Sequence, residues 1–225
     1  MPSARERVRA ELTADITDAA RRQLAEVGAS ALSLRAVARE VGMVSSAVYR
    51  YFPSRDDLLT RLIIDGYDDL GAAGEAADDP SAPPVERWLA VCRAVRSWAL
   101  AHPHEYALLY GSPVPGYQAP EDTIRAASRV GIVLGRILGD AARSGALPEG
   151  DGERDPGLVS DDAVAVLGGE HPALDETVRV RALLAWSSLF GTISFELFGH
   201  FVGSVEDGDR YFDRVVGELA TLIGL

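Results

Sequence analysis

The sequence predicts an all-α protein. Apolar residues recur with the 3.6-residue period of an amphipathic helix along most of the chain, and no sustained alternation of apolar and polar residues occurs between turn residues. Apolar residues make up 47% of the 225 residues, which is enough for a substantial core. We therefore expect helices joined by turns.

The N-terminal quarter predicts a rapid succession of helices. The first covers about residues 5–27, and we expect Gly28 to end it as a left-handed cap. A short second helix begins at Ser33, whose hydroxyl is expected to cap it, and ends near Glu40. A third helix covers about residues 45–51.

Pro53 then breaks the chain, and a fourth helix follows. A Ser-x-x-acid capping box formed by Ser54 and Asp57 marks its start. We expect this helix to fade at the glycines of residues 71–74 and to give way to an acidic, proline-rich connection over residues 74–84.

The rest of the chain predicts further helices separated by two loops. The loops cover residues 111–120, which hold three prolines, and the acidic stretch 145–160. The helices expected here begin at Pro84 and Pro103 or cover about residues 121–143, 161–167, 175–201 and 206–222.

The stretch from Ser33 to Leu59 has the residue types that a helix-turn-helix requires. Ala38 lies where two helices would cross closely, and Gly42 lies in the turn, where a positive φ favours glycine. Apolar contacts between the helices are expected from Val37, Val41, Met43, Val48 and Tyr51. An ordinary helical hairpin would explain the apolar spacing, but it would not explain the placement of Ala38 and Gly42.

The charge of the chain is segregated. The net charge is −12, which alone argues against nucleic-acid binding. However, residues 1–61 carry ten Arg and eight Asp or Glu, a net charge of +2, and the remaining residues have a net charge of −14. This distribution is expected if only the N-terminal segment meets phosphate.

Residues 33–59 resemble the DNA-binding segment of the TetR family of bacterial transcriptional regulators. The resemblance rests on Gly42, a short helix ending in Tyr49-Arg50-Tyr51-Phe52, and the run Pro53-Ser54-Arg55-Asp56-Asp57-Leu58-Leu59, and it extends over about residues 5–65. Residues 185–200 are similar to one C-terminal domain type of this family.

The resemblance implies two domains and a function. A helix-turn-helix DNA-binding domain would occupy residues 1–53, and a helical ligand-binding and dimerisation domain residues 54–225, with residues 54–73 as the connecting helix. The protein would be a homodimeric repressor, not an enzyme. A small, apolar or aromatic effector would release it from a palindromic DNA operator.

The resemblance also assigns DNA contacts. Tyr49, Ser33 and Arg55 would meet phosphates, and residues of the recognition helix would read bases. The full set of expected DNA-binding residues is Ser33, Arg35, Ser45, Ser46, Ala47, Tyr49, Arg50 and Arg55, with Arg39 as a further candidate. Val44 stands where the family often has a Ser or Thr that caps the recognition helix, so Ser45 is expected to cap it instead. Whether Ser45 or Ser46 contacts a base stays open.

The C-terminal helices predict a dimer. The helix expected over residues 175–201 is apolar on nearly every face, so it must be covered on more than one side. A partner subunit would cover it, with Gly191 and Gly199 permitting close approach. The expected interface residues are Trp186, Phe190, Ile193, Leu197, Phe212 and Val216. The alternative is the central helix of a monomeric bundle.

Aromatic residues of the middle segment predict a ligand pocket. The expected pocket residues are Trp88, Trp98, Tyr106, Tyr110, Tyr117 and Glu196. Each aromatic residue has an alternative place in the core. Glu196 is either a polar anchor of the pocket or half of a buried ion pair with an arginine.

Other chemistries find little support. The single cysteine, Cys92, excludes an intramolecular disulfide and reads as a small buried hydrophobe. His102 and His104 form a weak metal signal, so we expect no metal or cofactor. The N-terminus lacks an apolar signal core, which predicts a soluble cytoplasmic protein with no membrane partner.

The alternative function is an all-α small-molecule-binding protein or enzyme whose helix-turn-helix no longer functions.

Overall fold

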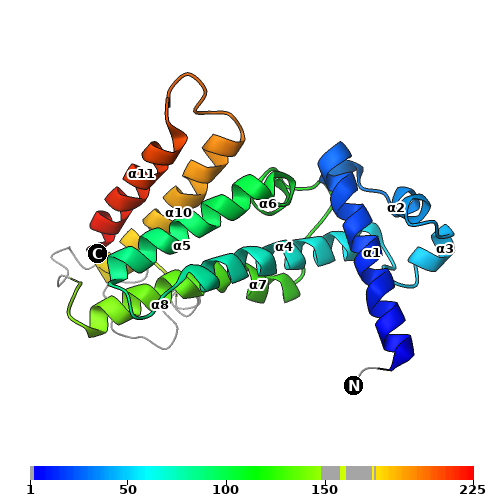
Figure 1. The fold of residues 1–225 in the computed structure, drawn as a ribbon, viewed down its shortest axis with the longest axis horizontal. Coiled ribbons are helices and arrows are strands. Elements are labelled where there is room, and N and C mark those ends of the chain that lie inside the picture. Colours follow the sequence, from blue (N-terminus) through cyan, green and yellow to red (C-terminus); the bar gives the residue numbers. More distant parts are fainter. Residues whose placement is uncertain (1–2, 148–157, 161–173, 175) are drawn as a thin grey trace. The chain divides into compact units, whose positions relative to one another are not determined.

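The computed structural model describes residues 3–147, 158–160, 174 and 176–225 (Figure 1). Every regular element in these residues is a helix, so the all-α prediction is confirmed. The elements are α1 (Ala4–Val27), the 3-10 helix η1 (Ala29–Ala31), α2 (Leu34–Glu40), α3 (Ser45–Val48), α4 (Arg55–Ala77), α5 (Pro84–Ala101), α6 (Pro103–Tyr110), α7 (Asp122–Ala127), α8 (Arg129–Arg143), α10 (Glu176–Leu197) and α11 (Gly208–Ile223). The helix expected at 161–167 and most of the loop expected at 145–160 lie outside the described residues.

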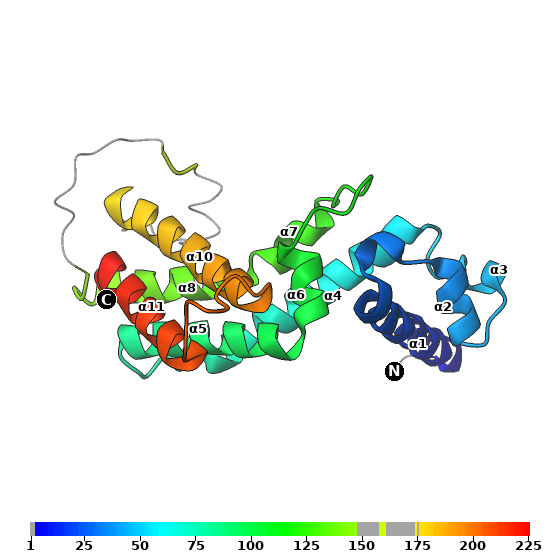
Figure 2. The same ribbon diagram turned by 90° about the horizontal axis from the view of Figure 1, so that it is seen from above.

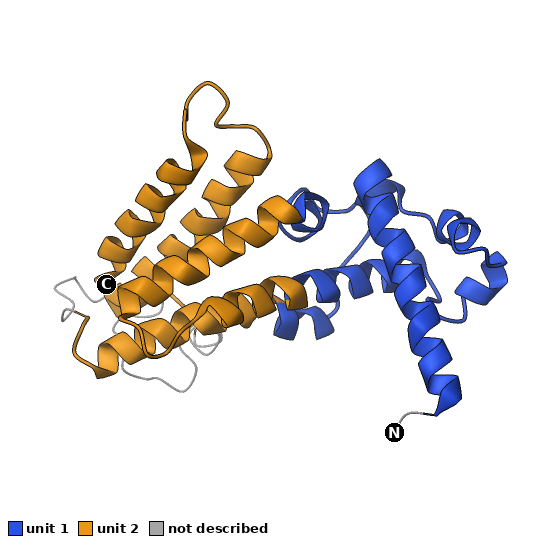
Figure 3. Ribbon diagram, viewed as in Figure 1, with its two compact units in different colours: residues 1–67, 102–126 blue, residues 68–101, 127–225 orange. Residues whose placement is uncertain are grey.

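The chain forms two compact units (Figure 3). Unit 1 contains residues 1–67 and 102–126, and unit 2 contains residues 68–101 and 127–225. Compactness does not test which residues meet DNA. The functional division after residue 53 therefore stays a prediction.

The core of unit 1 joins the first four helices to a segment that follows α5. Ile16 of α1, Val37 of α2, Val48 of α3 and Leu58 of α4 are all fully buried in it. Val114, from the loop after α6, is buried in the same cluster. The helix-turn-helix thus packs on residues distant in sequence as well as on its neighbours.

Polar caps fix the starts of two helices in unit 1. Ser3 and Glu6 form a capping box at α1. The predicted pairing at α4 is confirmed, because the Asp57 amide donates to the Ser54 hydroxyl at 3.1 Å and this hydroxyl donates to the Asp57 carboxylate at 2.7 Å. Gly28 ends α1 with φ 75° and ψ 166°, so its φ is positive but its backbone is not the expected left-handed helical one.

The prediction that the fourth helix fades at residues 71–74 is wrong, because α4 continues to Ala77. Its glycines are packing positions. A Cβ on Gly71 would lie 2.6 Å from the Cβ of Arg129, and one on Gly74 would lie 3.7 Å from a methyl of Val91. Small residues inside α4 therefore let α8 and α5 approach it closely.

Two further helix boundaries differ from expectation. The helix expected over residues 121–143 is divided at Ser128 into α7 and α8. The helix expected to reach residue 201 ends at Leu197, because Gly199 takes φ 78° and the His200 amide bonds back to the Phe195 carbonyl at 2.8 Å.

Unit 2 is a helical bundle in which α10 and α11 lie side by side (Figures 1 and 2). The helix α5 packs against α8 and α11, and the indole of the buried Trp88 donates to the Val216 carbonyl of α11 at 3.0 Å. Among the helices that the structure describes, none combines the length and apolar character of a membrane crossing.

A buried ion network joins three segments of unit 2. The Asp78 side chain has no exposed surface and accepts two hydrogen bonds from Arg87, at 2.6 and 3.0 Å. Arg136 of α8 donates to the same carboxylate at 2.7 Å, and Arg87 also reaches Asp140 at 2.7 Å. Arg87 holds the pKa of Asp78 below its ordinary value, so this carboxylate is charged at neutral pH.

Candidate nucleic-acid interface

The turn between α2 and α3 has the expected geometry. Gly42 takes φ 68°, and the Met43 amide bonds to the Ala38 carbonyl at 2.8 Å. Ala38 is fully buried, so no larger side chain would fit between the helices without displacing them. The prediction of a turn glycine beside a close crossing is confirmed.

The start of α3 differs from expectation. Val44 is the N-cap residue with its side chain 71% exposed, and no side chain caps the helix. Ser45 is the first helical residue, so the expectation that it takes over the cap is wrong. Residues 49–51 continue α3 as a turn, and Phe52 is buried in the core.

The expected cap at α2 is also wrong. The Ser33 hydroxyl makes no capping bond, and the Ser33 amide instead donates to the side chain of Gln23 at 3.3 Å. A hydroxyl not engaged by its own helix is available to an external acceptor or donor.

The side chains expected to contact DNA all lie at the surface of unit 1. Arg35, Arg39, Ser46, Tyr49 and Arg50 are exposed. The half-buried members of the expected set are Ser33, Ser45, Ala47 and Arg55. Of the two serines whose role the sequence left open, Ser46 is therefore the more accessible.

The exposed arginines of the helix-turn-helix carry unneutralised charge. Within the described part of the chain, the side chains of Arg35, Arg39 and Arg50 form no ion pair and no hydrogen bond. By contrast, Arg87 and Arg129 of unit 2 each meet two carboxylates. A surface with free guanidinium groups attracts a polyanion.

Arg55 differs from the other arginines of this surface. Its guanidinium donates to the Ala29 carbonyl at 2.8 Å and to the Ser30 carbonyl at 3.1 Å. The side chain thus fastens the start of α4 to η1. Its expected phosphate contact stays a prediction, and it would have to be made in addition to these two bonds.

The residues expected at a dimer interface are mostly internal to the protomer. Phe190, Ile193, Phe212 and Val216 are buried against other helices of unit 2, and only Trp186 and Leu197 are half-exposed. These four side chains pack in the core of the protomer, and their part in a dimer interface stays a prediction.

Most of the exposed residues of α10 form a different set, which leaves out Leu183. The stripe of α10, as we call it, consists of Val180, Leu184, Ser187, Gly191, Phe195 and Phe198, spaced three or four residues apart, with the last just beyond the helix end. None of these residues is charged, and a Cβ on Gly191 would meet nothing within 4 Å. The stripe is thus continuous, apolar and open.

The residues expected to bind a ligand fall into both units. Tyr106, Tyr110 and Tyr117 belong to unit 1, where the rings of Tyr106 and Tyr110 lie 5.0 Å apart and Tyr67 packs edge-on against Tyr110 at 5.9 Å. Burial raises the pKa of the Tyr110 phenol. The structure thus brings the tyrosines of α6 together with one that the sequence did not single out, Tyr67 of α4.

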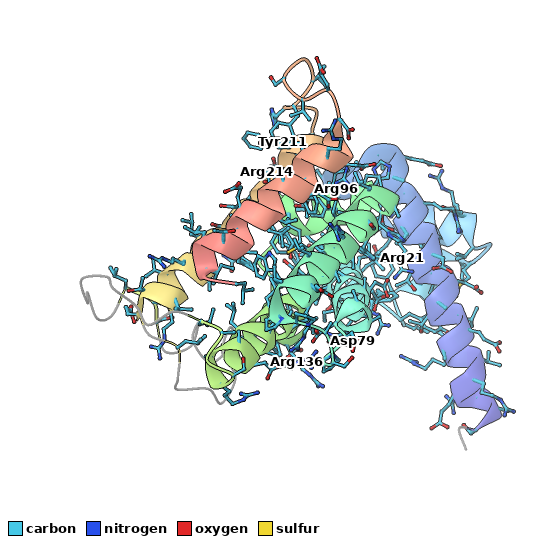
Figure 4. All side chains as sticks on the ribbon, turned by 60° about the vertical axis from the view of Figure 1, so that its left-hand side comes forward. Arg21, Asp79, Arg96, Arg136, Tyr211 and Arg214 are labelled. Atoms are coloured by element: carbon cyan, nitrogen blue, oxygen red, sulfur yellow. The ribbon has the colours of Figure 1, made fainter. Side chains whose placement is uncertain are left out.

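The members of the expected pocket in unit 2 have structural partners. Trp88 and Trp98 are buried in α5. Glu196 of α10 accepts two hydrogen bonds from Arg96 of α5, at 2.6 and 2.7 Å, and Arg96 also reaches Asp209 of α11 at 2.8 Å. Figure 4 labels Arg96 among the side chains of the protein. Of the two readings of Glu196, the ion pair with an arginine is the one observed, although Glu196 also borders an open pocket of about 190 Å³.

Cys92 is fully buried in α5. Burial raises the pKa of its thiol, because the thiolate would lose its hydration. The thiol therefore stays protonated and serves the core, as the sequence predicted.

Comparison with known proteins identifies both parts of the chain. Residues 16–62 match a family model described as bacterial regulatory proteins, tetR family, and residues 88–219 match one described as tetracyclin repressor-like, C-terminal domain. The chain is 40% identical to the HTH-type transcriptional regulator Rv1816 of Mycobacterium tuberculosis over 205 residues, which cover 86% of this chain and 83% of the relative.

Solved structures extend the likeness to the whole fold. The crystal structure of SCO4313, assigned as a regulatory protein, has a TM-score of 0.78 and 34% identity, covering 98% of this chain and 100% of that one. A bacterial regulatory protein of the tetR family from Rhodococcus RHA1 has a TM-score of 0.64 and 21% identity over 94% and 96% of the two chains.

Proposed function

The chain belongs to the TetR family of HTH-type transcriptional regulators, and we propose that it acts as a homodimeric repressor which a small effector releases from a palindromic operator. The matched relatives are transcriptional regulators and not enzymes. The observation that carries the proposal is the exposed surface of α2, α3 and the turn after α3, with its three unneutralised arginine side chains. We place this activity in the cytoplasm, where the operator is.

On this surface we assign roles by exposure and chemistry. Ser46, more exposed than Ser45, would read a base edge from the major groove, and Ala47 would contact a thymine methyl. Tyr49 and Arg50 follow α3 and would donate to phosphates, which sets the position of the helix on the duplex.

The stripe of α10 supports the dimer. It offers apolar surface with no charge to desolvate, and the Ser187 hydroxyl is already bonded to the Leu184 carbonyl at 2.9 Å. The open Gly191 at its centre allows another helix to approach closely. A second copy of the same stripe, related by a two-fold axis, is the occupant that matches it.

For the effector we propose a small apolar or aromatic molecule. The tyrosines of α4 and α6 support this proposal, because their rings pack against each other and aromatic walls suit such ligands. Binding of the effector would shift the population toward a dimer whose two DNA-binding domains have a separation that no longer matches the operator half-sites.

Substitutions of Tyr49 and Arg50 test the DNA-binding surface. We expect Arg50→Ala to weaken binding to the DNA upstream of the protein's own gene. It should also lower the salt slope, which is the steepness with which the logarithm of the binding constant falls with the logarithm of the salt concentration. The expected decrease is about 2 for a dimer, because each phosphate contact contributes about 0.9 to this slope. Tyr49→Phe should weaken binding with little change of slope, since it removes a neutral donor. Fluorescence anisotropy across a salt series measures both.

Arg93→Ala is the matched control, because Arg93 is an exposed arginine of unit 2 that is paired with Asp213 at 2.7 Å. Its DNA affinity should equal that of the wild type. If Arg50→Ala and Tyr49→Phe bind as the wild type does, the assigned surface is wrong. If the wild type binds no DNA, the alternative of a non-functional helix-turn-helix is favoured.

A further inference from the structure

The start of α1 projects beyond the core of unit 1. Every residue from Ser3 to Glu11 is exposed, and the first buried residue of the helix is Ile16. Packing therefore contributes little to these two turns, and the capping box of Ser3 and Glu6 holds their first residues in helical form. An ordered helical end without a core to cover is free to meet another molecule.

One face of this projecting end forms an open groove with the residues that follow α3. The groove has a volume of about 500 Å³. Its lining residues are Ala4, Arg5, Val8, Arg9, Arg50 and Tyr51. The four from α1 have the i, i+1, i+4 and i+5 spacing of a single helix face.

The groove is cationic and carries no compensating acid. Three of its six lining residues are arginines, and in the described part of the chain none of their three guanidinium groups forms an ion pair or hydrogen bond. The acids nearest in sequence, Glu6 and Glu11, are not among the lining residues. Glu6 accepts the Ser3 amide at 2.6 Å, which lowers its pKa and keeps it occupied at the helix end.

The groove is also preorganised. The guanidinium carbon of Arg9 lies 5.2 Å from the centre of the Tyr51 ring, a cation–π contact that holds this arginine against the chain after α3. Tyr51 packs in turn on the hydrophobic core of unit 1. Arg9 is thus fixed relative to Arg50, the residue already assigned to the DNA surface.

We propose that Arg5 and Arg9 form, with Arg50, a second phosphate-binding site for the backbone of the operator duplex, outside the helix-turn-helix. The inference rests on the proposed DNA-binding function and extends it to the N-terminal end of α1. The charge of the groove, its openness and its continuity with Arg50 fit a run of phosphodiesters. Because these contacts read no base, the site adds affinity and salt dependence and not sequence preference.

The double variant Arg5→Ala/Arg9→Ala tests the proposal. We expect its salt slope for the upstream duplex to fall by about 3 to 4, because a dimer would lose four arginine–phosphate contacts worth about 0.9 each. The preference for the operator over an unrelated duplex should stay as in the wild type. Both side chains are exposed, so the fold should persist, which circular dichroism verifies.

Two matched controls sharpen the test. Arg7→Ala removes one positive charge from the same turns of α1 but from a residue outside the groove, so it should leave the slope nearly unchanged. Arg5→Lys/Arg9→Lys keeps the charges and should restore most of the slope.

Each outcome decides something definite. A double alanine variant that binds as tightly as the wild type at every salt concentration overturns the site and leaves the proposed function intact. If Arg7→Ala lowers the salt slope by as much per arginine removed as the double variant does, the site is also overturned, because the effect would then be one of net charge. A wild type without DNA binding overturns the site and the function together.

Discussion

Leu184→Asp is expected to yield a folded monomer. Leu184 lies in the stripe of α10 and is 50% exposed in one protomer, so an aspartate there is solvated in the monomer but buried unpaired in a dimer. Sedimentation velocity should report half the mass of the wild type. Operator affinity should fall about 100-fold or more, because the second DNA-binding domain no longer binds as part of the same molecule.

Two variants separate this effect from simple destabilisation. Ile132→Asp changes an α8 residue of similar exposure, 47%, which lies outside the stripe, and it should leave a dimer. Phe190→Asp changes a predicted interface residue that the fold buries, and it should unfold the protein. If Leu184→Asp sediments as the wild type does, the stripe is not the interface.

Asp78→Ala is expected to have the largest effect on stability, about 3–5 kcal/mol, because it leaves the buried Arg87 without its bidentate partner. Urea denaturation measures the difference. Asp213→Ala is the matched control. The Asp213–Arg93 pair has a similar distance, 2.7 Å, but both side chains are about half exposed. The control should cost about 1 kcal/mol or less. Equal losses in the two variants would contradict the importance of burial.

The same network predicts a pH dependence. Arg87 lowers the pKa of Asp78 in the folded protein, so the carboxylate stabilises the fold at pH values above its unfolded pKa of about 4. This stabilisation is lost as the pH falls through the lowered folded pKa. The stability difference between the wild type and Asp78→Ala should therefore be full at pH 7 and should shrink in strong acid.

Local sequence signals predicted the helix-turn-helix well because its requirements are local. Gly42 follows an apolar helix face at the spacing of a turn, and its positive φ agrees. Gly71 looks equally like a break, yet it is helical. The glycine makes room for Arg129, whose side chain fills the space above it from 58 residues further along the chain. Such tertiary contacts leave no mark in the sequence around the glycine.

The site was predictable only in part for a similar reason. Phe190 and Phe195 lie on the same apolar helix, and no local pattern distinguishes the one that a neighbouring helix of the same chain covers. Phe190 is 5% exposed and Phe195 is 51% exposed. Arg5 and Arg9 carry no clear signal in the sequence, because an arginine pair near a helix start usually marks a solvated face. Their i, i+4 spacing is a weak signal that gains meaning only from Tyr51 and Arg50 beside them.

The central claim is that two copies of this helix-turn-helix read one symmetric operator. Nuclease footprinting of the DNA upstream of the protein's own gene tests it most directly. We expect two protected half-sites in inverted repeat whose centres lie about one helical turn, roughly 34–36 Å, or a multiple of it apart. Protection of a single half-site without symmetry, or no protection even at low salt, would contradict the claim.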